Sequence, residues 1–163
     1  SSASQNTLII EDHSSCNFIK KSSYFLVDNG LKVLKKINED CIVDIIPTFM
    51  AAHTFPPEFI YDKDRYIDLI CNEMIPKVAE EKLALYCDVF CEKNYFSVEQ
   101  SKRVLETGNK YGLKSRLHAD EFIDSGAAEL AAEIAVACAA LALAAAPAPA
   151  ALMEVAEVAI AAL

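Results

Sequence analysis

Positive charge is scarce in this 163-residue chain. Fifteen lysines and arginines stand against 24 acids, giving a formal net charge of -9. Affinity for nucleic-acid phosphates requires clustered lysine and arginine, and the few pairs present, such as Lys35 with Lys36, fit the solvated face of a helix. We therefore expect no nucleic-acid partner.

Three other patterns are also missing. The six cysteines form no CxxC pair and no regular ladder, which argues against a zinc knuckle or a secreted disulfide scaffold and favours reduced thiols in the cytoplasm. Residues 1–15 lack the basic segment and apolar run of a signal peptide. Residues 135–151 are almost uncharged, but alanine dominates them and Pro147 and Pro149 interrupt them, so we expect no membrane span.

Hydrophobic periodicity divides most of the chain into alternating strands and helices. Strands are predicted at 7–10, 16–20, 41–49, 83–91 and 113–122, and helices at 31–37, 64–82 and 98–111. Ser97 with Gln100 forms a capping box before the third helix, Gly112 suits its left-handed end, and Pro76 should kink or restart the second. The order predicts an α/β fold with right-handed crossovers and a parallel sheet, resembling part of a barrel. A complete eight-fold barrel needs at least about 200 residues.

The segment LKSRLHADEF, residues 113–122, concentrates candidate chemistry at the end of a predicted strand. His118, Asp120 and Glu121 lie within four residues. In parallel α/β folds the carboxyl ends of strands carry the binding site. A neutral imidazole there can ligate a metal, and a carboxylate three residues later can orient a substrate or handle its proton. The alternative is a structural histidine bonded to a neighbouring acid.

The composition changes after Gly126. Nineteen of the last 37 residues are alanine, four are glutamate and none is lysine or arginine. A helix is predicted from residue 127 to about 136 and another over 152–163, while 137–146 fits either a strand or more helix. Three explanations of this alanine-rich composition remain open: designed filler, an alanine-substituted or incompletely identified region, and a natural alanine-rich tail.

Several longer strings together resemble one family. They are PTFMAAHTFPPEF (47–59), YIDLICNEMIPKVAEEKLA (66–84), DVFCEKNYFSVEQSKRVLETGNKYGLK (88–114), and LHADEF with GAAELAAE (117–122 and 126–133). Over roughly residues 13–135 the chain resembles imidazolonepropionase, a metal-dependent amidohydrolase that opens the ring of 4-imidazolone-5-propionate in histidine degradation. The resemblance implies a partial (β/α)8 TIM barrel of the amidohydrolase type, with about four to five βα units, over residues 1–136. Residues 137–163 would form an alanine-rich continuation, a strand plus a helix.

The resemblance also implies roles for single residues. His118 matches the histidine that ligates the active-site zinc or iron. Glu121 matches the catalytic acid that contacts the substrate ring, and His53 matches a substrate-binding histidine. Tyr24, in KKSSY, matches a tyrosine that contacts substrate. A small-molecule substrate, a cytoplasmic location and a homodimer follow from the same resemblance.

The chain departs from the family at the metal site. It has only three histidines, His13, His53 and His118, and contains neither the family's HxH pair nor the aspartate of the last barrel strand. Ala139 and Ala140 stand where the family has an acid and a histidine. Because a catalytic zinc requires three or four ligands, tight metal binding is not expected. The alternative is an inactive barrel fragment, incompletely assigned or engineered chain that only folds or assembles, with open sheet edges that would pair or aggregate.

Overall fold

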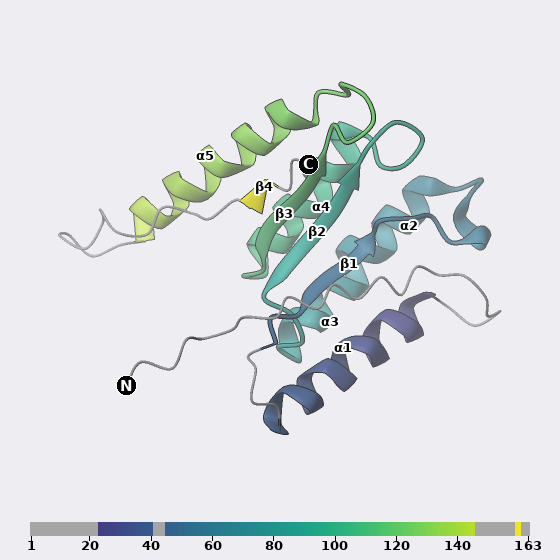
Figure 1. Cartoon of the computed structure of the whole chain (residues 1–163), viewed down its shortest axis with the longest axis vertical. Helices are drawn as coiled ribbons and strands as arrows, with labels where there is room; N and C mark the ends of the chain where they lie inside the picture. Colours follow the sequence, from purple (N-terminus) through teal and green to yellow (C-terminus); the bar gives the residue numbers. More distant parts are fainter. Residues whose placement is uncertain (1–22, 41–44, 146–158, 161–163) are drawn as a thin grey trace.

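A parallel β-sheet forms the centre of the chain (Figure 1). The computed structural model describes residues 23–40, 45–145 and 159–160, with side chains described within 29–39 and 45–139. Strands β1 (Thr48–Ala52), β2 (Tyr86–Cys91) and β3 (Lys114–Ala119) lie side by side in chain order, and the two-residue β4 (Ala159–Ile160) pairs with β3. Every pairing is parallel. The predicted parallel α/β class is therefore confirmed.

Helices connect and flank these strands (Figure 1). Helix α1 (Ser23–Asp40) precedes β1, the 3-10 turn η1 (Pro57–Phe59) and α2 (Lys63–Leu69) follow it, and α4 (Val98–Lys110) joins β2 to β3. Between α2 and β2 the chain passes through the π-helical segment η2 (Ile70–Met74) and α3 (Ile75–Glu80). Helix α5 (Ala127–Ala145) follows β3.

The core lies between one face of the sheet and helices α2 to α5. Phe49, Val89 and Leu117 face it from the three strands, and each is at most 2% exposed. Helix α4 comes especially close to β2, because a Cβ built on Gly108 would lie only 3.0 Å from the Cβ of Cys87. These contacts leave the alternate residues of the strands, including Asp88 and His118, on the opposite face of the sheet.

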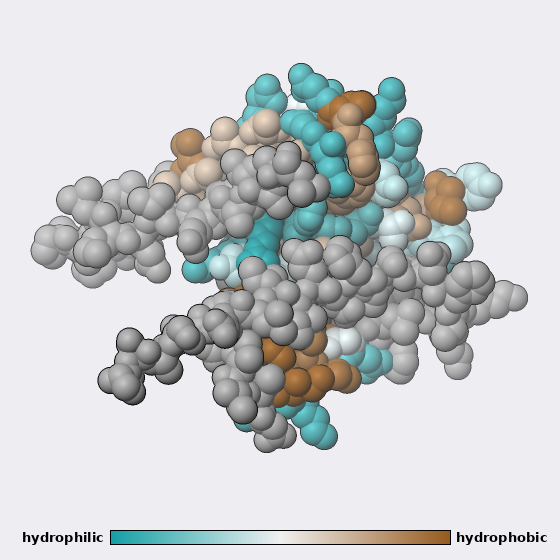
Figure 2. Space-filling view, in the orientation of Figure 1, coloured by the Kyte–Doolittle hydropathy of each residue, from teal (hydrophilic) through white to brown (hydrophobic). Residues whose placement is uncertain are grey.

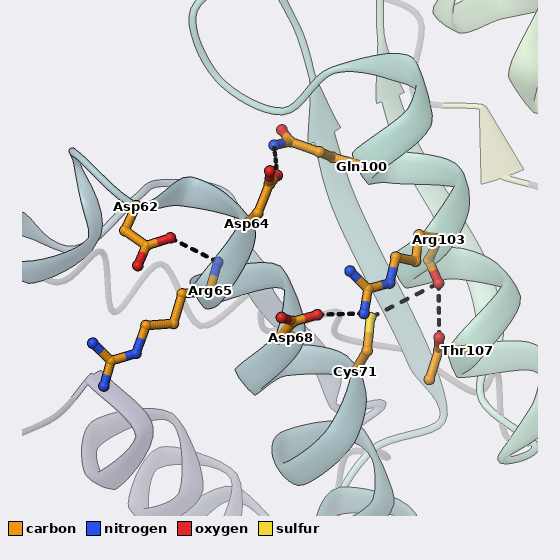
Figure 3. A network of polar contacts seen from close by, with 8 residues as sticks. All are labelled: Asp62, Asp64, Arg65, Asp68, Cys71, Gln100, Arg103 and Thr107. Atoms are coloured by element: carbon orange, nitrogen blue, oxygen red, sulfur yellow. Dashed lines mark hydrogen bonds and ion pairs between the residues drawn. The ribbon is translucent and has the colours of Figure 1, made fainter.

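Polar contacts join α2 and η2 to α4 (Figure 3). Arg103 pairs with Asp68, Gln100 donates from Nε2 to Asp64 at 3.2 Å, and the Cys71 thiol of η2 donates to the Arg103 carbonyl at 3.9 Å. Within α4 the Thr107 hydroxyl donates to the same carbonyl at 2.7 Å. Because the Arg103–Asp68 pair is about half exposed, we expect it to contribute no more than about 1 kcal/mol. The apolar contacts beneath hold the two helices together.

Local signals predicted several helix boundaries correctly. Ser97 and Gln100 form both hydrogen bonds of the capping box at the start of α4. Gly112 adopts φ +85 immediately after that helix. The predicted restart at Pro76 is also confirmed: the five residues before α3 form the π-helical segment, and proline then occupies the first turn, where its missing N–H is tolerated.

Other boundaries differ from the predictions. Strand β1 begins at Thr48, and residues 41–44 of the strand predicted there lie outside the described residues. Strand β3 ends at Ala119 because Asp120 turns into a left-handed conformation with φ +54. Helix α5 continues to Ala145, so residues 137–145 form more helix and no strand, in accord with the helix propensity of alanine. The helix predicted over 152–163 is wrong at 159–160, which pair with β3.

Some predictions concern residues outside the described ranges or stay untested. The strands predicted at 7–10 and 16–20 lie outside the described residues, as do Cys16 and Cys41. The four described cysteines, Cys71, Cys87, Cys91 and Cys138, are free. The division of the chain at residue 136 stays a prediction, and α5 crosses it without a break. Among the described helices, none is long and apolar enough to cross a membrane.

Candidate functional site

Three polar side chains from three neighbouring strands meet near the carboxyl ends of the sheet. His53 directly follows β1, Asp88 lies in the middle of β2, and His118 lies near the end of β3. In the parallel register Phe90 is opposite His118, so Asp88 lies two residues below His118, toward the amino ends of the strands. The two imidazoles therefore stand closer to the strand ends, and the carboxylate lies deeper.

An irregularity in β1 turns His53 toward this group. The register pairs Thr48 with Tyr86 and Ala52 with Val89, so β1 uses one residue more than β2 over the same span. In a regular ladder His53 would point to the same face as Val89, where the helices pack. The extra residue reverses the face, as a β-bulge does, and places His53 beside Asp88.

The three ligand-bearing groups lie within 4.8 Å of one another. Nδ1 of His118 is 3.1 Å from Oδ1 of Asp88, and Nε2 of His53 is 3.6 Å from the same oxygen. The two imidazole rings meet edge to face with centroids 4.9 Å apart. Nε2 of His53 is buried and has no hydrogen-bond partner, so this nitrogen is the least satisfied atom of the group.

Burial and hydrogen bonding act in opposite directions on Asp88. The side chain is only 2% exposed, whereas His53 and His118 are 20% and 22% exposed. Burial raises the pKa of Asp88, but contacts with His118 and then His53 outweigh it and lower the pKa to about 2. Asp88 is thus an anion that accepts hydrogen bonds and donates none.

Aromatic rings border both histidines. Phe90, the next residue of β2 on the same face, stacks against His53 at 6.0 Å and meets His118 edge to face at 6.2 Å between ring centroids. Tyr95 and Phe122 pack against Phe90 in turn. The polar group therefore has an apolar wall on one side, formed by Phe90 and the part-exposed rings packed against it.

A second polar group adjoins Asp88 on the same face and extends toward the amino ends of the strands. Arg116 is opposite Asp88 in the register. Its guanidinium stacks on the ring of Tyr86, 3.8 Å from the centroid, and donates from one terminal nitrogen to the Thr48 hydroxyl at 2.9 Å. Stacking and this hydrogen bond hold the cation among part-buried groups.

Two acids near the strand ends, Glu92 and Asp120, hold loop amides. Glu92 accepts from the backbone N–H groups of Phe122 and Lys93, at 2.9 and 2.8 Å, and the Phe122 bond is the main cause of its lowered pKa. Asp120 accepts from the backbone and hydroxyl of Ser125 and from the first amides of α5. Burial raises the pKa of Asp120, but these hydrogen bonds outweigh it, and the net pKa is lowered.

The structure brings together only part of the predicted site. His53 and His118 meet, whereas Glu121 is exposed in the loop after β3, beyond the strand that was expected to carry it. Asp120 begins a left-handed turn there, so the strand no longer fixes the direction of the Glu121 side chain. Tyr24 lies in α1, and its side chain is outside the part that the structure describes.

Asp88 is the site residue that sequence reasoning missed. It lies inside the string DVFCEK that carries the resemblance, and it is the one acid within the otherwise mostly apolar strand YCDVFC. A buried carboxylate in such a strand requires partners, and this was the available signal. The identity of the partners depends on the β1 irregularity, which no local pattern revealed.

The sequence offered only His118 as a metal ligand, whereas the structure brings three donor groups together, and this set fits a divalent metal in its chemistry. Two imidazoles and one carboxylate are ligands used by both zinc and non-haem iron, and the part-exposed histidines face the strand ends. A cavity of about 410 Å3 lies away from this group, between α1, α3 and the loops that lead into β2 and β3. Its lining contains no histidine, cysteine or acid. Metal chemistry in the described part of the chain is therefore sought at the histidine–aspartate group.

Comparison with known proteins finds bacterial relatives that are all named imidazolonepropionase. The chain is 48% identical over 118 residues to imidazolonepropionase of Shouchella clausii, and the match covers 70% of the chain and 26% of that protein. It is 54% identical over 101 residues to the enzyme of Thermoanaerobacter pseudethanolicus, covering 62% and 24%. This chain is similar to imidazolonepropionase. The enzyme of Alkaliphilus metalliredigens adds a match of 49% over 104 residues, covering 64% and 25%.

These matches confirm the resemblance drawn from the sequence strings. The chain spans about a quarter of the length of the imidazolonepropionases it matches. No family model matches the chain.

Proposed function

We propose that this chain carries part of the active site of an imidazolonepropionase-type hydrolase in histidine degradation. The reaction would hydrolyse the cyclic amide of 4-imidazolone-5-propionate to N-formimidoyl-L-glutamate. The observation that supports the proposal is the meeting of His53, Asp88 and His118 at the carboxyl ends of parallel strands, the position where α/β enzymes bind their substrates. The similarity to imidazolonepropionases supports the choice of reaction.

In this proposal the sheet is a section of a (β/α)8 barrel with four to five βα units. The helix-covered face would be the outside of the barrel wall, and the face with Arg116, Asp88 and His118 would line its interior. Parallel strands joined by α4 and flanked by α5 support this arrangement. Binding of a small-molecule substrate, a cytoplasmic location and a homodimeric assembly belong to the same proposal.

His118 would hold a divalent zinc or iron, with His53 and Asp88 close by. Such a metal, when bound, supplies Lewis acidity and lowers the pKa of a bound water. His53 would bind the imidazolone ring through its part-exposed edge, beside the apolar wall of Phe90. Glu121, in the loop between β3 and α5, would move a proton to the ring nitrogen that leaves.

The test measures metal content and turnover on the same preparation. Folded chain loaded with zinc or with iron should contain close to one metal per chain and convert imidazolonepropionate, and both signals should fall to background in His118→Ala. His13→Ala serves as a matched control, because the resemblance assigns His13 no role. A folded chain with neither metal nor turnover would refute the proposal for this chain.

A second function is favoured by one observation. Glu121 is exposed and stands on a loop instead of on the strand, so the catalytic acid is not held at the histidines. On that basis we alternatively propose an inactive barrel fragment, or an incompletely assigned or engineered chain, that acts only as a folding or assembly unit. Normal folding without metal or turnover would support this alternative.

A further inference from the structure

The contact between His118 and Asp88 determines which ring nitrogen of His118 carries the proton. Nδ1 of His118 lies 3.1 Å from Oδ1 of a carboxylate that is 2% exposed. An ionised carboxylate only accepts hydrogen bonds, and a neutral imidazole carries its single proton on one of two nitrogens. A hydrogen bond in this position therefore requires the proton to be on Nδ1 and leaves the lone pair on Nε2.

The depth of Asp88 in the sheet distinguishes two roles for its carboxylate. A distance of 3.1 Å between Nδ1 and Oδ1 suits a hydrogen bond, and it also suits two atoms that bind one ion. However, Asp88 lies two residues below the Phe90–His118 pair, and the imidazoles, about one-fifth exposed, lie between it and the strand ends. An ion that enters from the strand ends reaches the histidines before the carboxylate.

Oδ1 of Asp88 lies closer to His118 than to His53. Its Nε2 is 3.6 Å from Oδ1 of Asp88 and forms no hydrogen bond, whereas His118 is within hydrogen-bond distance. The two imidazole rings pack edge to face with centroids 4.9 Å apart, so His53 lies next to the His118–Asp88 hydrogen bond without taking part in it. Asp88 thus selects between the two imidazoles.

We propose that Asp88 is a positioning residue that holds His118 as the Nδ1–H tautomer and thereby presents Nε2 to a divalent cation. Carboxylates that accept from the second nitrogen of a ligating histidine orient the ring and increase its basicity, and losing them typically lowers metal affinity 10- to 100-fold. This inference rests on the proposed function in one respect, namely that the site takes a metal. The tautomer itself is a property of the chain alone.

Nitrogen-15 NMR of the metal-free chain tests the tautomer directly. With only three histidines in the sequence, His13→Gln and His53→Gln variants assign the ring signals. At pH 7.5 His118 should show a protonated Nδ1 and an unprotonated Nε2. Asp88→Asn and Asp88→Ala should release it into a mixture of tautomers, while Glu92→Gln, which removes another buried carboxylate, should leave it unchanged. An Nε2–H tautomer or a doubly protonated ring in the unaltered chain would overturn the proposal.

Zinc titration separates this inference from the proposed function. Added Zn2+ should shift the Nε2 signal of His118 and preserve Nδ1–H, and chelator competition should show 10- to 100-fold weaker binding in Asp88→Asn. Loss of the Nδ1–H signal on zinc binding would show that the hydrogen bond to Asp88 does not survive in the zinc complex and would overturn the positioning role. If the unaltered chain binds no zinc, the metal proposal fails, and the metal-free tautomer still decides whether Asp88 orients His118. Circular dichroism checks that each variant folds.

Discussion

At the scale of single residues, Asp120 connects the end of β3 to the start of α5. Its carboxylate accepts from the Ser125 amide at 2.7 Å and from the Ala128 amide at 2.9 Å, with the Ser125 hydroxyl and the Ala127 amide as further donors. Unpaired amides at a helix start favour a negative charge. One side chain therefore holds the loop that carries Glu121.

Replacement of Asp120 should destabilise the fold, although the packing of the hydrophobic core stays unchanged. We expect Asp120→Ala to lower the free energy of unfolding by about 1 to 3 kcal/mol, because several donors lose their acceptor. Asp120→Asn should cost less, since its amide oxygen still accepts and asparagine tolerates the positive φ. Urea unfolding measures both values. Equal loss in the two variants would contradict the expectation.

The charge on Asp120 makes the stability of the chain depend on pH, and the sign of this dependence can be predicted. The pKa of Asp120 is lowered from its ordinary value of 3.8 in the folded chain. Its contribution to stability is therefore fully present above that ordinary value and is lost as the pH falls through the lower folded-state pKa. The difference in unfolding free energy between the unaltered chain and Asp120→Asn should shrink as the pH decreases below 4. A difference that stays constant with pH would show that the charge contributes nothing.

Site residues were predictable to the degree that their roles depend on nearby sequence. His118 could be found from its place near a strand end and from the LHADEF string. Asp88 could not be assigned, because its partners are 35 residues before it and 30 residues after it in the chain. Glu121 was predicted on the strand and lies in the loop after it, since Asp120 adopts a left-handed conformation stabilised by contacts with the following helix.

At the scale of elements, helices with local end signals were the most predictable. The capping box at Ser97 and Gln100 closes within four residues, and it sets the start of α4 with no help from the tertiary fold. The start of β1 at Thr48 was missed because Ile45 and Ile46, just before it, are as apolar and β-branched as a strand. The irregularity within β1 depends on pairing with β2, and a single strand's sequence does not encode which residue is extra.

The end of α4 gives a prediction for an element boundary. Gly112 has φ +85, and a Cβ built there meets no atom within 4 Å. The cost of a side chain is therefore in the backbone alone. We expect Gly112→Ala to destabilise the chain by roughly 1 kcal/mol and Gly112→Asn to cost less, because asparagine tolerates this conformation better. Chemical denaturation of the two variants measures the difference. A stabilised Gly112→Ala variant would contradict this account.

At the scale of the whole molecule, the described sheet has an edge at β1, next to α1. The described strands run in the order β1 to β4, and α1 contacts β1. Val33 and Ile37, one turn apart on α1, are 56% and 48% exposed. Figure 2 shows hydrophobic surface in the lower part of the view, where α1 lies. Unpaired strand edges and adjoining apolar surface favour association.

We therefore predict that the isolated chain self-associates through α1 and the edge of β1. Light scattering over a range of concentrations should show a mass that rises reversibly above that of the monomer. Val33→Glu combined with Ile37→Glu should shift this equilibrium toward the monomer, because two carboxylates would have to be desolvated at the contact. Ile60→Glu is the matched control, since Ile60 is 51% exposed and follows η1, away from α1 in the sequence. A monomer at all concentrations, or equal effects of the control and the double variant, would place the association elsewhere or exclude it.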